Sequence, residues 1–277
     1  MKYEDKVRKL NMQMQQFAKK DIAVAFSGGA DSSLLLKIAV DAAAACDSIV
    51  YGIFMHTMLH PVEEAEEAKI LAEQIGARFR MIAVDELQGA GILDNPTDRC
   101  YRCKKYLFER LLKECASLGV STVLEGTNED DLHVYRPGLQ AVRELGIVSP
   151  LADTGLTKAE VRRLGMEYGI SASEKPASPC LATRFPYGTR LSYEAMRKVE
   201  QGERFIREKG FYNVRLRIHG DIVRIEVDTK EFPYLMKERE AVIVYLKQLG
   251  YHYITLDLEG FRSGSMDIIE DIGSGRY

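Results

Sequence analysis

The sequence predicts an α/β fold with a doubly wound parallel sheet, followed by a smaller α+β domain. Three observations support this fold class. Short apolar runs alternate with stretches of helical periodicity through residues 1–170 of the 277-residue chain, as expected of repeated strand–helix–strand units. A stretch with three prolines and no periodicity follows at residues 171–188. Beyond it the pattern changes to helix, strand, strand, helix and strand, which is typical of a separate α+β unit.

The first 170 residues supply the elements of the parallel sheet. A helix over residues 3–18 has Val7, Leu10, Met14 and Phe17 on one face, the spacing of a helix packed against a core. The next elements are inferred from apolar runs, turn residues and capping signals, including Thr157 and Glu160 at capping-box spacing. We expect strands at 22–26, 49–55, 79–84, 122–124 and 147–151, and helices from Ser32 to about Cys46, from Pro61, from the end of a 87–101 loop to about Leu118, and from Thr157.

The C-terminal part has a different composition and a different order of elements. We expect a linker over residues 171–190 that carries Cys180, and then a small domain over residues 191–277. Gly220-Asp221 marks a hairpin turn in that domain. Its expected elements are helices at 192–208 and 238–248 and strands near 213–218, 221–227 and 253–258.

Charge and hydropathy exclude several classes of protein. The 38 basic and 41 acidic residues give a net charge of −3, whereas a general nucleic-acid-binding domain is usually basic. No apolar run approaches the roughly 18 residues of a membrane span, and the chain does not begin with a signal-peptide pattern. We therefore expect a cytoplasmic protein that binds neither nucleic acid nor membrane.

The motif Ser-Gly-Gly-Ala-Asp-Ser-Ser after the first strand predicts an anion-binding loop. Gly28 and Gly29 allow a tight turn with inward N–H groups, and the following helix adds the positive end of its dipole. The hydroxyls of Ser27, Ser32 and Ser33 supply further donors. The spacing differs from the Walker loop, because no Gly-Lys-Ser/Thr follows. The alternative interpretation is an ordinary glycine turn between a strand and a helix.

A second glycine turn is expected beside the first. The segment Glu125-Gly-Thr-Asn128 directly follows the short fourth strand. Open parallel sheets bind ligands at the carboxyl ends of their strands. We therefore expect this turn, and Met55 at the end of the second strand, to border the same site as the phosphate loop.

The five cysteines fall into two groups. Cys46 and Cys115 follow leucines and alanines at helical spacing and are expected in the core. Cys100 and Cys103 form a Cys-x-x-Cys motif, expected on a loop among basic residues that lower thiol pKa values, and Cys180 lies in a non-helical turn. One pair and one distant cysteine suit a 4Fe–4S cluster with three protein ligands and one open iron. The alternative is a dithiol redox pair with an unrelated third cysteine.

Five segments, spread over nearly the whole chain, together resemble one family of ATP-dependent sulfur transferases. The family, known as LarE, builds the nickel-pincer cofactor of lactate racemase and belongs to the PP-loop ATPases, which split ATP into AMP and pyrophosphate. The proline-rich segment around Cys180 is far more specific than the phosphate loop alone. The matching segments are Ser27–Ser33, Glu125–Asn128, Tyr135–Gly138, Pro176–Arg184 and Gly260–Met266.

This resemblance implies a reaction in two steps. ATP first adenylates the carboxylates of pyridinium-3,5-biscarboxylic acid mononucleotide, because a carboxylate is a poor electrophile until its oxygen joins an AMP leaving group. The glycine-rich loop and Mg²⁺ stabilise the departing pyrophosphate. Sulfur then replaces the adenylate. In one branch of the family the cysteine at the Cys180 position gives up its own sulfur, and in another three cysteines hold a 4Fe–4S cluster with an exchangeable sulfide.

Because Cys100 and Cys103 accompany Cys180, the chain resembles the branch with a cluster, and these three residues are its expected ligands. The resemblance implies catalytic roles for Cys180, Asp31 and Arg184. Asp31 is assigned by position to Mg²⁺, with a helix cap as the alternative. The expected ATP-binding residues are Ser27, Gly28, Gly29, Asp31, Ser32, Ser33, Met55, Gly126, Thr127 and Asn128. The expected substrate-binding residues are Arg184, Arg215, Glu226 and Arg262, since arginine forks suit phosphate, and the alternative for each is a solvated surface position.

The implied partners are a small-molecule nucleotide substrate, other proteins of nickel-pincer cofactor synthesis, and further copies of the chain in a homo-oligomer such as a hexamer. Three other functions share some of these features. A tRNA-thiolating enzyme also pairs a PP-loop with three cysteines, but the acidic net charge disfavours it. A synthetase that forms amides would need an ammonia source, and a nucleotide-binding redox sensor would leave the arginines of the small domain without a role.

Overall fold

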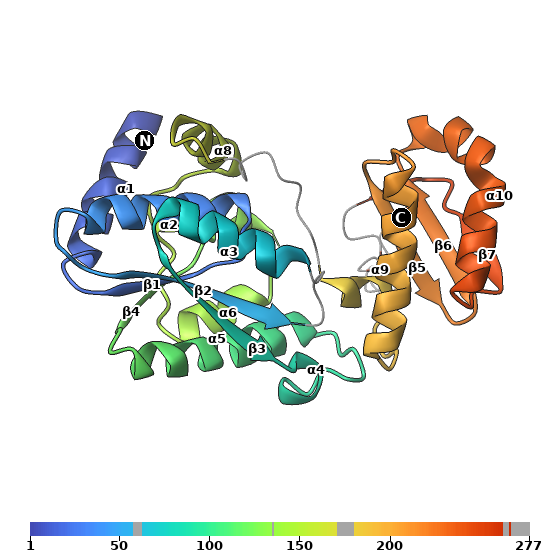
Figure 1. The fold of residues 1–277 in the computed structure, drawn as a ribbon, viewed down its shortest axis with the longest axis horizontal. Helices are drawn as coiled ribbons and strands as arrows, with labels where there is room; N and C mark the ends of the chain where they lie inside the picture. Colours follow the sequence, from blue (N-terminus) through green and yellow to red (C-terminus); the bar gives the residue numbers. More distant parts are fainter. Residues whose placement is uncertain (58–62, 135, 171–179, 263–265, 267–277) are drawn as a thin grey trace. The chain divides into compact units, whose positions relative to one another are not determined.

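The structure is a computed structural model that describes residues 1–57, 63–134, 136–170, 180–262 and 266 (Figure 1). The chain divides into two compact units. The first unit contains Met1–Ile92 and Asp98–Ser178, and the second contains Leu93–Thr97 and Pro179–Tyr277. No helix among the described residues is long and apolar enough to cross a membrane. Pro61, Tyr135, the segment Pro176–Pro179 and Ser263–Ser265, which the sequence analysis used, lie outside the described residues.

The first unit is built on a four-stranded parallel sheet in the order β3-β2-β1-β4. The strands are β1 (Ile22–Ala25), β2 (Val50–Thr57), β3 (Arg78–Val84) and β4 (Thr122–Leu124). β1 lies between β2 and β4, with Ile22 opposite both Val50 and Thr122. The order reverses at β1, so the carboxyl ends of β1 and β4 border a crevice of the kind where doubly wound sheets bind ligands.

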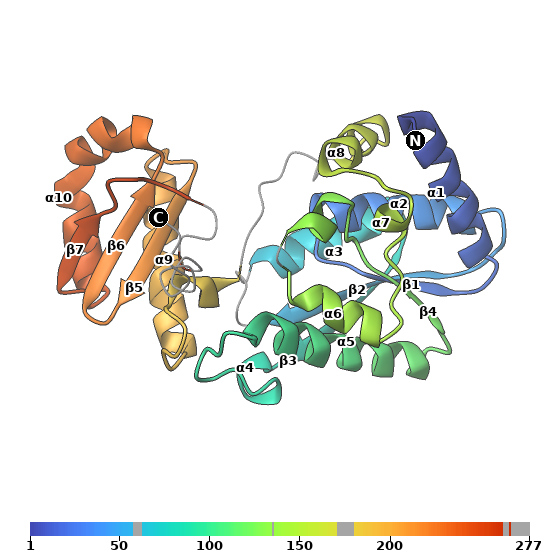
Figure 2. The same ribbon diagram turned by 180° about the vertical axis from the view of Figure 1, so that it is seen from behind.

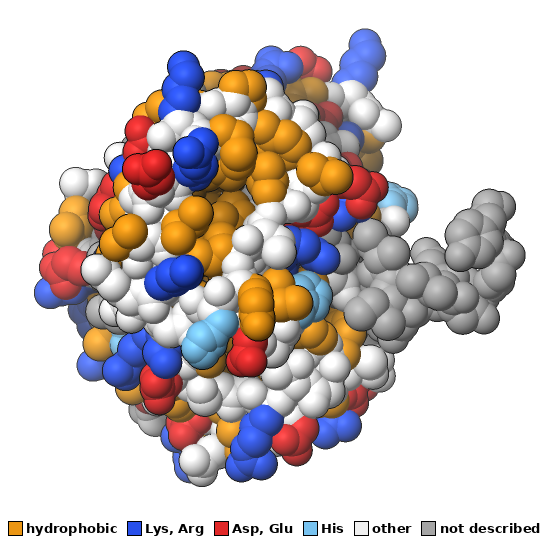
Figure 3. Space-filling model, turned by 90° about the vertical axis from the view of Figure 1, so that its right-hand side faces the viewer, with side chains coloured by type: hydrophobic (Ala, Val, Ile, Leu, Met, Phe, Trp, Pro, Cys, Tyr) orange, Lys and Arg blue, Asp and Glu red, His pale blue; other side chains and the backbone are white. Residues whose placement is uncertain are grey.

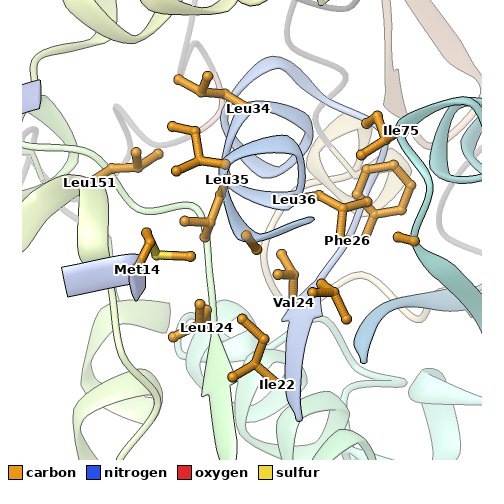
Figure 4. Packing of buried hydrophobic residues seen from close by; sticks show 14 of the residues in the cluster. Met14, Ile22, Val24, Phe26, Leu34, Leu35, Leu36, Ile75, Leu124 and Leu151 are labelled. Carbon is orange, nitrogen blue, oxygen red and sulfur yellow. The ribbon is translucent and has the colours of Figure 1, made fainter. Parts of the chain in front are cut away.

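Helices cover both faces of this sheet (Figures 1 and 2). One face carries α1 (Tyr3–Phe17), α2 (Ala30–Ala43), α3 (Glu63–Ile75) and α8 (Lys158–Glu167), which share one apolar core. Figure 4 shows Leu34, Leu35 and Leu36 of α2 directed toward side chains of β1 and of neighbouring elements. The other face carries α5 (Arg99–Ser117) and α6 (Gly138–Glu144) over a second cluster. The doubly wound parallel sheet predicted from sequence is confirmed.

The first unit differs from the sequence prediction in several places, one of which is the helix α6, which was not expected. The expected fifth strand at 147–151 is only an isolated bridge between Leu124 and Val148, and the helix α7 (Pro150–Asp153) follows at once. Pro150 explains the difference, because it cannot donate to a sheet and its fixed φ favours the first turn of a helix. The expected loop at 87–101 contains the short helix α4 (Glu86–Gly89), capped by Asp85.

The second unit has the predicted order of helix, strand, strand, helix and strand. Its elements are α9 (Tyr193–Glu208), β5 (Val214–His219), β6 (Ile222–Val227), α10 (Phe232–Gln248) and β7 (Tyr253–Leu256). β5 and β6 form the expected antiparallel hairpin, and β7 adds to β6 in parallel. Gly220 turns the hairpin with φ +61°, a backbone region that favours glycine. α10 begins earlier than predicted, because Pro233 occupies its first turn.

The sheet of the second unit has one apolar and one charged face. Val214 and Leu216 of β5 alternate with Arg215 and Arg217, and the antiparallel partner β6 repeats the pattern. The apolar face lies against α9, where a Cβ added to Gly202 would come within 2.5 Å of a methyl carbon of Leu216. Close contact of helix and sheet therefore requires a glycine at this position.

Residues Leu93–Thr97 pack with the second unit although the chain around them belongs to the first. Asn95 is fully buried with φ +48°. Its amide nitrogen donates to the carbonyl oxygens of Phe185 (3.1 Å) and Pro186 (2.8 Å), and its own carbonyl accepts from Gly188 N. The segment is thus held by hydrogen bonds to the residues that follow Cys180.

Part of the surface of the second unit is apolar. Met236, Ile243 and Val244 on α10 and Tyr253 on β7 are exposed, and Figure 3 shows hydrophobic side chains gathered over part of one face of the molecule. Leu235, Val242 and Leu246 of α10 are buried. α10 is therefore apolar on its buried side and on part of its exposed side.

Candidate active site

The phosphate loop connects β1 to α2. Gly28 has φ +71°, and a Cβ added there would lie 3.3 Å from the Cβ of Ala68. Ser27 and Ser32 hold the loop, because their hydroxyl oxygens are 3.1 Å apart and Ser32 Oγ accepts from Ser27 N at 3.2 Å. The turn therefore presents its backbone at the positive end of α2, as an anion-binding loop requires.

The Gly-Thr-Asn turn lies directly against the phosphate loop, as expected. A Cβ added to Gly126 would approach the backbone nitrogen of Ser32 to 3.0 Å, so only glycine allows this contact. Asn128 is 1% exposed, and its amide nitrogen donates to Asp31 Oδ1 at 3.4 Å and to Asp131 Oδ2 at 3.0 Å. The two loops are thereby joined through Asn128 and Asp31.

A cavity of about 360 Å³ opens beside these two loops, within the range of small-molecule sites. Polar groups of both loops form one wall. The cavity is lined by residues of the two loops and of β2, namely Ser27, Gly29, Asp31, Ser32, Gly126, Thr127 and Met55. It is also lined by the apolar side chains of Phe26, Ile53, Phe54, Leu107 and Phe108. The combination of an apolar wall and an anion-binding loop suits a nucleotide, whose base and phosphates need different surroundings.

Three of the predicted nucleotide-binding residues do not line this cavity. Ser33 is fully buried on α2, and its hydroxyl has no hydrogen-bond partner among the described residues. Gly28 shapes the loop through its backbone conformation, and Asn128 acts through Asp31. Their positions indicate support of the loops rather than direct contact with a ligand.

Three basic side chains around the cavity were missed by the sequence analysis. Each forms an ion pair with a carboxylate at the rim: Lys158 with Asp31 at 2.5 Å, Lys104 with Glu125 at 3.3 Å, and Arg136 with Asp131 at 2.8 Å. Lys104, Arg136 and both carboxylates of the second and third pairs line the cavity. The cavity therefore has cations at hand for a polyphosphate.

One of these residues left a signal in the sequence. Lys158 is the first residue of α8, directly after the Thr157 cap, where the positive end of the helix dipole makes a cation unfavourable. A lysine at this position therefore indicates a specific partner, here Asp31. Glu125 is 4% exposed and accepts from Thr127 N, Thr127 Oγ1 and Ser149 Oγ. It orders the turn from within.

The Cys-x-x-Cys pair lies in the first turn of α5 rather than on a loop. The helix begins at Arg99, so Cys100 and Cys103 are three residues apart on neighbouring positions of one helical face. Cys100 is exposed and Cys103 half-buried, and none of the five cysteines, all of them described, is in a disulfide. Lys104 and Phe108 of the same helix line the nucleotide cavity.

The expectation for the other two cysteines is half right. Cys115 is buried, and burial raises its pKa to about 11. Cys46 is exposed rather than in the core, because α2 ends at Ala43 and the chain turns before Cys46. The helical spacing of apolar residues in the sequence extends to Cys46, but the helix itself ends at Ala43.

Cys180 begins a short 3-10 turn, Leu181–Arg184, in the second unit. Its carbonyl oxygen accepts from Thr183 N (3.1 Å), Thr183 Oγ1 (2.8 Å) and Arg184 Nη1 (3.2 Å). Arg184 is 3% exposed and pairs with the buried Glu203 through two parallel hydrogen bonds. Among the described His, Cys, Asp and Glu residues, no group of three is placed to hold a metal ion.

The remaining expected substrate residues lie on the charged sheet face and the segment after β7. Arg215 has no carboxylate within ion-pair distance among the described residues; it stacks on the Phe261 ring and donates to Val214 O. Burial, then the neighbouring charges of Arg184 and Arg217, lower the pKa of Arg215 to about 10. Arg262 pairs with Asp257 and Glu259. Among the described residues, Arg215 is therefore a partly buried arginine whose side chain forms no ion pair with a carboxylate.

Glu226 is fully buried and pairs with Arg217 and Arg224. Sequence reasoning also missed Glu203, whose carboxylate holds Arg184. Glu203 follows Met196 and Val199 on the buried stripe of α9. A carboxylate on such a stripe indicates a buried partner, since an isolated charge is rarely buried.

The fold and the cavity define an ATP-using enzyme of the PP-loop class, and a sequence model described as NAD synthase matches residues 2–93. Three relatives match nearly full length. A pyridinium-3,5-bisthiocarboxylic acid mononucleotide synthase of Lactiplantibacillus plantarum is 38% identical over 246 residues, which cover 89% of this chain and 88% of the relative. Uncharacterised proteins of Synechocystis (36%; 94% and 97% covered) and Methanocaldococcus jannaschii (32%; 90% and 94%) are also similar. The chain belongs to the family of this mononucleotide synthase, LarE.

Proposed function

We propose that the chain is an ATP-dependent sulfur transferase that converts the carboxylates of pyridinium-3,5-biscarboxylic acid mononucleotide into thiocarboxylates. AMP and pyrophosphate are the other products of the activation step. The observation that carries the proposal is the pair of glycine turns joined at the mouth of one cavity, with Asp31 between them. The near full-length similarity to a synthase with this product supports the choice of substrate.

The first unit performs the activation. The N–H groups of the phosphate loop and the hydroxyls of Ser27 and Ser32 hold the polyphosphate, and the apolar wall with Met55 holds the base. Asp31 is the proposed Mg²⁺ ligand, because its carboxylate lines the cavity. Lys158 now pairs with this carboxylate, and in the proposed reaction Lys158 binds the polyphosphate instead and leaves the carboxylate to Mg²⁺. Mg²⁺ supplies charge for the leaving pyrophosphate.

The second unit supplies the sulfur-bearing residue and a phosphate site. We assign the binding of the substrate's phosphate to Arg215 and Arg262. The guanidinium of Arg215 has no ion pair with a carboxylate among the described residues. Direct contacts of Arg184 and Glu226 with substrate stay predictions. Cys180 is the proposed point from which sulfur is delivered to the acyl adenylate.

Cys100, Cys103 and Cys180 are the proposed ligands of a 4Fe–4S cluster. The donor set fits the group, because the three residues carry thiols that are not in disulfides, and two of them lie on neighbouring positions of one helical face. When bound, the cluster supplies an exchangeable sulfide at its open iron. The homo-oligomeric state and the contact with other proteins of cofactor synthesis stay predictions.

The test uses anaerobically purified protein with ATP, Mg²⁺ and the biscarboxylate mononucleotide. We expect pyrophosphate release that depends on this substrate, and a thiocarboxylate product by mass spectrometry. Ser27→Ala abolishes both, whereas Ser48→Ala, a serine that donates to Ala18 O away from the cavity, leaves both intact. Pyrophosphate release that responds to tRNA instead of the mononucleotide contradicts the proposal.

The cluster is tested by iron and sulfide content and by the visible spectrum after reconstitution. We expect about four irons in the wild type and loss of the cluster in Cys180→Ala and Cys100→Ala. Cys46→Ala is the matched control, because Cys46 is exposed like Cys100. No iron in any variant removes the cluster and leaves Cys180 as a sacrificed residue, detected as a mass loss of roughly 34 Da after one turnover, the mass of H₂S.

A further inference from the structure

We propose that Glu203 and Glu226 are positioning residues for Cys180, each acting through one buried arginine on the turn that Cys180 begins. The proposal rests on the proposed function, in which Cys180 is the site of sulfur delivery. It adds two carboxylates that hold the backbone of this residue in a fixed place.

The first chain of contacts runs from α9 to the carbonyl of Cys180. Glu203 is 1% exposed and accepts from Arg184 Nε at 2.9 Å and Nη2 at 3.0 Å. Leu216 N on β5 donates to the same carboxylate at 3.0 Å. The remaining nitrogen of Arg184, Nη1, donates to Cys180 O at 3.2 Å and to Thr183 Oγ1 at 2.9 Å.

The second chain of contacts runs from β6 to the same turn. Glu226 is fully buried and accepts from Arg217 Nε at 3.0 Å. Arg217 is 4% exposed, and its Nη1 donates to Thr183 O at 2.9 Å. Both chains therefore have the same form: a buried carboxylate accepts hydrogen bonds from a guanidinium, and another nitrogen of that guanidinium donates to a carbonyl of the turn.

Stability alone does not account for this arrangement. Buried ion pairs often add little net stability compared with apolar residues of similar size, because both charges lose their water. Two such pairs that each end on a main-chain carbonyl of one short turn favour a positioning role. A fixed geometry matters for a group that must meet an acyl adenylate, since a misplacement of about 1 Å can cost about 100-fold in rate.

The planar fork of arginine gives the sharpest variants. Arg184→Lys and Arg217→Lys keep the positive charge for Glu203 and Glu226, but a single ammonium cannot hold the carboxylate bidentately and reach the carbonyl as well. We expect each to lower single-turnover thiocarboxylate formation by about 10- to 100-fold. For Arg217→Lys, substrate-dependent pyrophosphate release measured on the same samples stays within about twofold, because Arg217 is not among the residues assigned to ATP or to the mononucleotide.

Of the carboxylate variants, Glu203→Gln is expected to show the same split between the two steps as Arg217→Lys, and Glu226→Gln is expected to lower thiocarboxylate formation. Glu238→Gln is the matched control, since Glu238 pairs with Lys209 in the same unit without contact to the turn, and it changes neither rate. If a glutamine variant fails to fold, the lysine variants carry the test.

Hydrogen exchange gives a readout that does not depend on catalysis. The amide of Thr183 is bonded to Cys180 O and that of Phe185 to Ala182 O. We expect exchange in the 180–185 peptide to be about tenfold faster in both lysine variants than in the wild type, with α2 peptides unchanged. Unchanged exchange in that peptide overturns the anchoring.

Two further outcomes would overturn the positioning role. Equal loss of pyrophosphate release and thiocarboxylate formation overturns the positioning role and indicates substrate binding or folding. Thiocarboxylate formation at the wild-type rate in folded lysine variants also overturns it. If the wild type itself releases no pyrophosphate with the mononucleotide, the proposed function fails, and the exchange measurement alone then decides whether the anchor exists.

Discussion

The two units use ion pairs in opposite ways. Around the cavity of the first unit, the side chains of Lys158 and its partner Asp31 are 37% and 23% exposed, and Lys104 is 34% exposed although its partner Glu125 is buried. In the second unit, Arg184, Glu203, Arg217 and Glu226 are all at most 5% exposed. The first kind of pair can open to water and to a ligand. The second kind cannot do so without leaving a charge in the protein interior.

The two kinds of ion pair differ in how easily they can open. A half-exposed pair contributes only about 0–1 kcal/mol to stability, so a lysine can leave its carboxylate for a phosphate at little cost. The freed carboxylate is then available to a metal ion. Buried pairs give up this freedom and gain fixed geometry. Arg215, beside them, is the exception that has no carboxylate of its own among the described residues.

The largest expected effect comes from removing one member of a buried pair. Glu226→Ala leaves Arg217 and Arg224 facing an empty position, which costs about 3–5 kcal/mol in the free energy of unfolding. Lys158→Ala, which breaks a half-exposed pair, costs at most about 1 kcal/mol. Urea unfolding of both variants measures the difference. Equal effects on the unfolding midpoint would abolish the distinction between the two kinds of pair.

The next effect concerns activity without stability. Asp31→Asn removes the charge that pairs with Lys158 and that would hold the proposed Mg²⁺, so pyrophosphate release falls about 100- to 1,000-fold, while the unfolding free energy changes by no more than about 1 kcal/mol. Asp41→Asn, in the exposed pair with Lys37 at the other end of α2, is the control. Pyrophosphate release retained in Asp31→Asn removes this residue from the mechanism.

A smaller effect is expected at Arg215. Loss of a charge-assisted contact to phosphate of about 1.5–3 kcal/mol raises the KM for the mononucleotide about 10- to 100-fold in Arg215→Met, with the KM for ATP unchanged. The fold is retained, because burial and neighbouring cations already disfavour the charge at this position. Steady-state kinetics with each substrate varied in turn check this. If only the KM for ATP rises, Arg215 does not bind the mononucleotide.

The smallest effect is a change of stability with pH. Burial alone would raise the pKa of Glu203, but Arg184 and the hydrogen bond from Leu216 N outweigh it, and the pKa lies below its ordinary value of 4.5. As the pH falls, Glu203 therefore binds a proton in the unfolded chain at a higher pH than in the folded chain. Stability from this residue is complete above about pH 5 and is lost as the pH falls through the folded pKa.

Urea midpoints between pH 7 and pH 3 measure this loss. Glu203→Gln has no carboxylate at this position, so its midpoint declines less steeply below pH 4.5 than that of the wild type. Identical slopes for the two proteins would show that Glu203 does not titrate with folding.

Local patterns in the sequence were sufficient for the fold and for the two glycine turns. β1, the phosphate loop and α2 follow each other directly in the chain. Their apolar periodicity therefore predicts the strand and the helix, and the glycines between them predict the anion-binding loop. The ion pairs could not be found in this way, because their members are far apart in the chain: Lys158 is 127 positions from Asp31. Cys46 shows the opposite error, in which a helical spacing was carried three residues past the end of its helix.

The charged face of β5 and β6 was only partly predictable. Alternation along a strand places Arg215 and Arg217 on one face, and that much was inferred for Arg215. Which arginine meets a carboxylate depends on the register of β5 with β6 and on α9. The sequence alone could therefore not separate Arg215, the proposed phosphate ligand, from the arginines that hold the turn.

The segment Leu93–Thr97 has a consequence for how this protein can be divided and recombined. The second unit is not a continuous stretch of chain, because Asn95 supplies hydrogen bonds to Phe185 and Pro186 from a position more than 80 residues upstream. A gene fragment for residues 179–277 would lack those bonds and leave two carbonyl groups without their donor. The chain also crosses between the units at three places rather than one. Exchange of this unit between relatives by simple fusion of gene fragments is therefore disfavoured.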